Sequence, residues 1–125
     1  EKQRKLADAF VELSYTVIDE MQSGAKIGDI ARKAVTVAEK HGYDNDVLFG
    51  FGHGIGGVGN ESYPLILNMA PWSEMVLEPN MVEIAAVVLN RPGVGGMRLE
   101  APVWIKESGN EVLPKTPIEP DIIEI

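Results

Sequence analysis

The chain has 125 residues, 45% of them hydrophobic, and a mean hydropathy close to zero, which fits one globular domain with a real core. Its formal net charge is −8 and Lys and Arg do not cluster after residue 40, so we expect neither nucleic acid nor an anionic membrane as a partner. Because cysteine is absent, the sequence excludes disulfides, thiolate metal sites and cysteine nucleophiles. We see no secretory leader pattern and no bilayer-length apolar run in the sequence, and we expect a cytoplasmic location.

Two amphipathic helices are predicted at the start of the chain. Apolar residues recur at spacings of three and four with charged residues between them, which predicts a helix over residues 2–23 that stops at Gly24. A second apolar stripe, rich in alanine, predicts another helix from Ile27 to His41. We interpret His41 as a residue at a helix C-terminus that faces the negative end of the helix dipole.

Strands and turns are predicted after the helices. The apolar run over residues 82–89 is typical of a strand that is buried on both faces, and residues 97–106 form a second strand with alternating character. The glycine-rich segment 91–96 joins the two as a hairpin turn, and a short strand follows at 111–113. The proline-containing tail, residues 114–120, is expected to be extended. Helices first and antiparallel strands afterwards indicate an α+β fold.

A glycine-rich segment around one histidine points most directly to chemistry. Residues 49–59 place His53 among glycines, each of which gives up extra backbone entropy when the chain folds. Either a ligand or metal reaches His53 across a bare main chain, or another segment packs too tightly there for a Cβ atom. The segment alone does not favour one interpretation over the other.

The first residue suggests that the chain is a fragment. It opens at Glu1, not at Met, and Glu1 already lies within what is predicted to be the first helix. We therefore expect a single domain over residues 1–125 that continues a longer protein.

The order of several motifs resembles a known family. Two helices precede Gly52–Gly56 (Gly-His-Gly-Ile-Gly), and after these come a strand that begins at Met81–Val82, then Pro92–Glu100 and Gly109–Leu113. This arrangement, over nearly the whole chain, resembles the creatinase/aminopeptidase superfamily, which includes methionine aminopeptidase, Xaa-Pro aminopeptidase, prolidase and creatinase. The resemblance implies half of a "pita-bread" fold, with two N-terminal helices followed by a mostly antiparallel, curved sheet. The chain would be the C-terminal part of a larger catalytic domain.

The resemblance also implies a metal site. Peptidases of this superfamily bind two divalent ions through two aspartates, one histidine and two glutamates. His53 matches the histidine ligand and Glu100 matches the last glutamate, so both are candidate metal ligands. His53 is also the candidate catalytic residue, because imidazole titrates near neutral pH.

Other positions of the superfamily pattern differ here. Asn60 stands where a substrate-binding histidine is usual, and its amide can still donate a hydrogen bond to substrate. Ala86 stands where the remaining glutamate ligand is expected, and Glu83 cannot replace it because three residues along a strand place it on the other face. The two aspartates precede the first helix in the superfamily, and we interpret Asp8 and Asp19 as solvated residues of the first helix.

These matches and departures leave three functional hypotheses. The first is a fragment of a Xaa-Pro dipeptidase- or aminopeptidase-like metallohydrolase that cleaves a peptide C–N bond, with an incomplete metal site in this chain and Mn, Co, Zn or Fe in the intact parent. The alternatives are a non-catalytic relative that binds peptides or proteins, and a metal-free creatinase-like hydrolase with His53 as the base. We expect this chain alone to be inactive and to hold no metal tightly. The expected partners are a peptide or small C–N-bond substrate and either a homo-oligomer or the missing N-terminal half.

Overall fold

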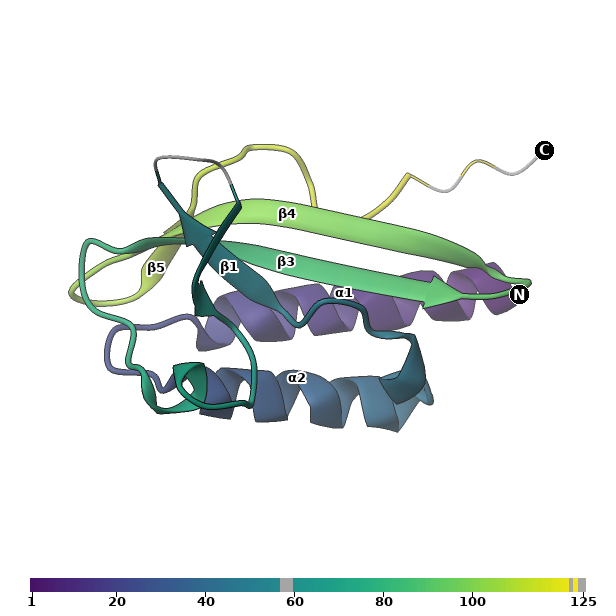
Figure 1. Ribbon diagram of the computed structural model, residues 1–125. Helices are drawn as coiled ribbons and strands as arrows, with labels where there is room; N and C mark the ends of the chain where they lie inside the picture. Colours follow the sequence, from purple (N-terminus) through teal and green to yellow (C-terminus); the bar gives the residue numbers. More distant parts are fainter. Residues whose placement is uncertain (57–59, 122, 124–125) are drawn as a thin grey trace.

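The computed structural model describes residues 1–56, 60–121 and 123, and for residues 60–63 the backbone alone. Two helices lie on one side of an antiparallel sheet, as Figure 1 shows. Helix α1 packs directly against the two longest strands, and helix α2 packs beside α1. In the described part of the chain, the opposite face of the sheet carries no helical layer.

Helix α1 spans Lys2–Glu20 and is three residues shorter than the sequence predicted. Gly24 adopts the left-handed conformation, with φ of 85°, but it lies beyond the end of the helix. The side-chain amide of Asn110 donates hydrogen bonds to the carbonyl oxygens of Ile18 at 2.6 Å and Met21 at 2.9 Å. A distant side chain therefore satisfies carbonyl groups at the end of α1.

Helix α2 spans Ile27–His41, as predicted, and ends at Gly42 in the left-handed conformation. The Gly42 N–H donates to carbonyl oxygens of the last turn, which is the usual way that a glycine closes a helix. A short 3₁₀ helix, η1 (Asp44–Asp46), leads from α2 towards the sheet.

The sheet has five strands in the order β2-β1-β3-β4-β5, and every neighbouring pair is antiparallel. The predicted glycine-rich hairpin is confirmed between β3 and β4, where Arg91 pairs with Gly95. A second 3₁₀ helix, η2, follows β2 and precedes β3 along the chain, and it contacts α2. The strands and η2 are β1 (Gly52–Ile55), β2 (Asn60–Leu65), η2 (Trp72–Glu74), β3 (Val82–Arg91), β4 (Gly95–Ile105) and β5 (Asn110–Val112).

The two faces of β3 differ, contrary to the prediction that this strand is buried on both faces. The side chains of Ala85, Val87 and Leu89 belong to the buried core, whereas Ala86 and Val88 are only half-buried. Because neighbouring residues of a strand point to opposite faces, Ala86 and Val88 lie on the face away from the helices. That face carries the candidate site.

The core is a single cluster between the helices and the sheet. It joins the apolar stripes of both helices to alternate residues of β3 and β4, and no helix of the described residues is long and apolar enough to cross a membrane. Its fully buried large side chains include Leu13, Val17, Met21, Ile27, Ile30, Val87, Leu89, Val103 and Ile105.

Candidate functional site

The glycine next to His53 allows two strands to approach closely. A Cβ atom added to Gly52 would lie 2.4 Å from the carbonyl oxygen of Ile84 and 2.6 Å from the Cδ1 atom of Ile66. Neither distance leaves room for a methyl group, so the tight-packing interpretation is correct for Gly52. The close packing holds β1 against β3 and fixes the position of His53 in the sheet.

The imidazole of His53 has one satisfied and one unsatisfied nitrogen. Its Nδ1 atom lies 2.8 Å from the carbonyl oxygen of Gly54, and its Nε2 atom is buried without a hydrogen-bond partner in the described part of the chain. Because a carbonyl oxygen only accepts, Nδ1 carries the proton of this bond and Nε2 of the neutral ring keeps its lone pair. A buried nitrogen without a partner costs folding free energy, so its position calls for a ligand or a proton.

The carboxylate of Glu100 faces that free nitrogen. Its Oε1 atom lies 3.9 Å from Nε2 of His53, which is too long for a hydrogen bond but close enough for both atoms to contact one ligand. Arg98, two residues earlier on the same face of β4, donates a hydrogen bond to Oε1 of Glu100. Glu100 is directly opposite Ala86 in the β3–β4 register, so the Ala86 methyl group also points to this place.

These side chains line a cavity of about 360 Å³. The volume lies in the range of about 300–1,000 Å³ that is usual for small-molecule sites. One end is polar, with an imidazole, a guanidinium and a carboxylate, and the rest is mainly apolar. The lining residues are Leu48, Phe49, Gly50, Gly52, His53, Leu65, Ala86, Val88, Arg98 and Glu100.

Comparison with known protein families identifies the chain. Residues 1–107 match the model of metallopeptidase family M24. The chain belongs to this family. The Xaa-Pro dipeptidase of Pyrococcus furiosus is 29% identical over 116 residues, which are 93% of this chain and 32% of the relative.

Solved structures of the same family share the fold. The prolidase from Pyrococcus furiosus matches with a TM-score of 0.83 and 27% identity over 94% of this chain and 34% of its own. The Xaa-Pro dipeptidase from Bacillus anthracis matches with a TM-score of 0.83 and 25% identity over 94% and 32%. The chain thus has the pita-bread fold of the prolidases and spans about a third of the length of these relatives.

The M24 family name implies metal ions, and the residues that the structure describes do not complete a site for them. Among the described residues no three His, Cys, Asp or Glu side chains lie together as a metal-binding group. His53 and Glu100 supply two donors, and the third side chain that the sheet brings beside them is the methyl group of Ala86. A hard divalent ion prefers several oxygen ligands, so the described residues by themselves do not fit a two-ion centre.

The structure tests the predicted site residues to different extents. The structure brings His53 and Glu100 together, and Ala86 lies between them in the same cavity. Their catalytic and metal-binding roles stay predictions. The backbone of Asn60 begins β2, but its side chain lies outside the described residues, so its substrate-binding role also stays a prediction.

The sequence reasoning missed Arg98 and Phe49, which both line the cavity. The signal for Arg98 was its spacing of two residues from Glu100, because residues at that spacing share one face of a strand. Phe49 had no such signal, because it lies in the irregular segment before β1.

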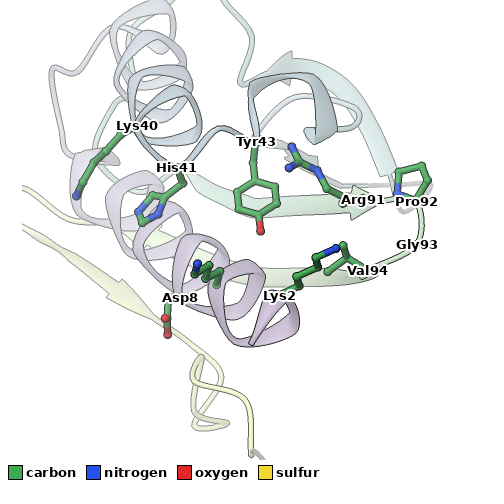
Figure 2. Close-up of a pocket in the computed structure, with 10 residues that line it drawn as sticks. Lys2, Asp8, Lys40, His41, Tyr43, Arg91, Pro92, Gly93 and Val94 are labelled. Carbon is green, nitrogen blue, oxygen red and sulfur yellow. The ribbon is translucent and has the colours of Figure 1, made fainter.

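A larger cavity, of about 780 Å³, lies at the N-terminal end of α1 (Figure 2). It shares no lining residue with the His53 cavity, and it contains several cationic side chains. Lys40 and His41 both bind Glu12, at 2.6 and 2.7 Å, and Arg91 binds Asp46. The hydrogen bond from Lys40, with a second from His41, lowers the pKa of the Glu12 carboxyl. Because Lys40, His41 and Arg91 already have acidic partners, the His53 cavity is the stronger candidate.

One buried carboxyl lies on the opposite face of the sheet. Glu83 is 4% exposed, and it has the same strand parity as the core residues Ala85 and Val87. Its Oε2 atom has no hydrogen-bond partner among the described residues, and burial raises the pKa of its carboxyl to about 7. The structure agrees with the prediction that Glu83 is on the wrong face to replace the missing donor at Ala86.

Proposed function

We propose that this chain is the C-terminal half of a Xaa-Pro dipeptidase-like catalytic domain that hydrolyses a peptide C–N bond. The observation that carries the proposal is the buried Nε2 atom of His53, which has no hydrogen-bond partner among the described residues and faces Glu100 across 3.9 Å at the polar end of a cavity. The family match and the dipeptidase relatives support the same reaction class. The relatives are about three times as long, so the reaction requires residues beyond this chain.

The residues of this chain can bind and orient a peptide and move a proton. The lone pair of Nε2 in His53 can accept a proton from the attacking water or return it to the leaving nitrogen. Glu100 is an acceptor for the amide or amine hydrogens of the substrate, and Arg98 holds that carboxylate in place by a charge-assisted hydrogen bond. Any metal ion, of Mn, Co, Zn or Fe, would need donors from the rest of the protein.

A histidine substitution in the full-length protein tests the proposal. We expect His53→Ala to lower kcat for a Xaa-Pro dipeptide by about 10²–10⁴-fold, the usual contribution of a general acid or base. The matched control is His41→Gln, because His41 is the other histidine of the chain and lines the separate cavity. Dipeptidase activity that survives in His53→Ala, with kcat unchanged, would make His53 structural.

A non-catalytic role is the second candidate, and the position of Ala86 favours it. A methyl group opposite Glu100 in the cavity stands where the family pattern expects a donor. Elemental analysis of the full-length protein for Mn, Co, Zn and Fe, together with Xaa-Pro cleavage, separates the two. Stoichiometric metal with cleavage supports the peptidase, and absence of both supports the binding role or, if a small amidine is hydrolysed, the metal-free hydrolase.

We also propose that the domain associates with the N-terminal half of its own fold or with a second copy. The helices cover only one face of the sheet, and the other face carries the half-buried residues Ala86 and Val88. A half-domain with an uncovered sheet face is expected to bury that face. Sedimentation of the 125-residue chain, alone and mixed with the upstream segment, tests this, and a monomer that does not bind the segment would contradict it.

A further inference from the structure

Phe49 is held at the rim of the His53 cavity in a conformation that a bulky residue rarely adopts. Its φ angle is 64°, in the left-handed region, and 89% of its surface is exposed. A single exposed apolar residue is ordinary on a protein surface, but a left-handed phenylalanine is not. Strain of this kind persists only where the surrounding structure imposes it, and it often marks a functional position.

The surrounding backbone does impose it. On one side the Leu48 N–H donates to the carbonyl oxygen of Val88 at 3.1 Å, and on the other the Phe51 N–H donates to that of Ile66 at 3.1 Å. The Phe51 carbonyl oxygen also accepts a hydrogen bond from the Ala86 N–H at 3.0 Å. These hydrogen bonds fix the backbone at Leu48 and at Phe51, and the two residues between them, Phe49 and Gly50, form an arch.

Gly50 makes the arch possible. Its φ angle is 80°, so two successive residues are left-handed, and a Cβ atom on Gly50 would lie 2.4 Å from the Cδ2 atom of Leu67. Only glycine fits there, because the position combines a positive φ with close contact. The consequence is that Phe49 is lifted out of the core, where an apolar ring would otherwise be buried, and lines the cavity with Leu48 and Val88.

We propose that Phe49 is a specificity residue of this site, and that its ring covers an apolar side chain of a bound peptide next to the bond held by His53 and Glu100. This rests on the proposed function only in taking the ligand to be a peptide. The cavity has the matching polarity, since Leu65, Ala86 and Val88 form an apolar part beside the polar end. A ligand with an amide group and a neighbouring apolar side chain satisfies both parts at once.

Two small probes test binding without any turnover. In the full-length protein we expect N-acetyl-L-leucinamide to bind about tenfold more tightly than N-acetylglycinamide, because the leucine side chain loses its contact with water. Phe49→Ala should remove this preference, and Phe49→Tyr should retain it because the ring is kept. Met69→Ala is the matched control, since Met69 is 55% exposed and does not line the cavity. Dissociation constants from ligand-detected NMR give the readout.

The melting temperature distinguishes a Phe49 ring that is free to contact substrate from a ring that another segment of the protein buries. If the ring is free for substrate, Phe49→Ala leaves the melting temperature of the full-length protein unchanged, and Phe49→Gly raises it by a few degrees by relieving the left-handed strain. A melting temperature that falls by several degrees in both variants would show that another segment buries the ring, and would overturn the proposal. Equal binding of the two probes to the wild type would overturn it as well. If the leucine preference holds but no peptide is cleaved, the hydrolase proposal fails while the role of Phe49 stands.

Discussion

Replacing Glu83 with glutamine should remove a pH dependence of folding stability. The Glu83 carboxyl is 4% exposed on the helix-facing side of β3, and burial raises its pKa from 4.5 to about 7. Gln is neutral at every pH and nearly the same size, so the substitution removes the titration while largely preserving the packing. The difference between the two proteins therefore isolates one group.

The sign of the effect follows from proton binding. Below about pH 4.5 the Glu83 carboxyl is protonated in both the folded and the unfolded chain, so the folding equilibrium does not depend on pH through this group. Between about pH 4.5 and 7 the folded chain keeps the proton that the unfolded chain releases, so folding stability falls as pH rises. The loss is at most about 3.5 kcal/mol, because each unit of pKa difference corresponds to about 1.4 kcal/mol, and it is smaller if water reaches the carboxyl.

Urea unfolding of the full-length protein at pH 5, 6, 7 and 8 measures this. Relative to Glu83→Gln, we expect the wild type to lose stability by up to about 2.5 kcal/mol between pH 5 and 8, because part of the loss has already occurred at pH 5, with little further change above the folded pKa. Glu107→Gln, at an exposed carboxyl in the turn before β5, controls for the loss of one negative charge. A difference between wild type and Glu83→Gln that is the same at all four pH values would refute the reasoning.

Three further substitutions test the packing and the site. Asn110→Ala should destabilise the protein by about 1–3 kcal/mol, because it removes both hydrogen bonds of the amide, although the Ile18 carbonyl oxygen still accepts from the Met21 N–H. An unchanged denaturation midpoint would show that water replaces the amide. Gly52→Ala should cost about 1–3 kcal/mol, because its Cβ atom would collide with a β3 carbonyl oxygen, and a wild-type melting temperature would contradict the close packing of β1 on β3. Ala86→Glu should raise the affinity of the full-length protein for Mn²⁺ or Zn²⁺ by about tenfold or more in calorimetry, because it adds a third donor to His53 and Glu100, whereas Ala86→Gln should not.

The helices and the β3–β4 hairpin could be predicted from local patterns. The apolar spacing of α1 and α2 and the glycine-rich turn between β3 and β4 are short-range signals, and the structure confirms them with small shifts at the ends. The end of α1 was missed because Asn110, ninety residues away in the sequence, supplies the donor there. No short-range signal contains that contact.

The site was predicted in part. The family resemblance identified His53, Glu100 and Ala86, and the strand register now explains why they belong together. Phe49 could not be predicted, because its left-handed conformation depends on hydrogen bonds that its neighbours make to two different strands. The alternation of β3 placed Glu83 on the other face, but the raised pKa of its carboxyl depends on burial that only the folded chain produces.

The free-energy cost of burying the His53 imidazole indicates that this side chain has a functional role and is not there for packing. The buried Nε2 atom has no partner among the described residues, and a buried polar atom left unpaired costs about 1–3 kcal/mol, which an apolar side chain of similar size would not. The Gly54 carbonyl satisfies only Nδ1, and the Glu100 carboxylate, 3.9 Å from Nε2, is beyond hydrogen-bond distance. Gly52 accounts for the close strand packing without any requirement for an imidazole next to it. The cost at His53 therefore requires a compensating role, and a ligand or proton between Nε2 and Glu100 would provide one.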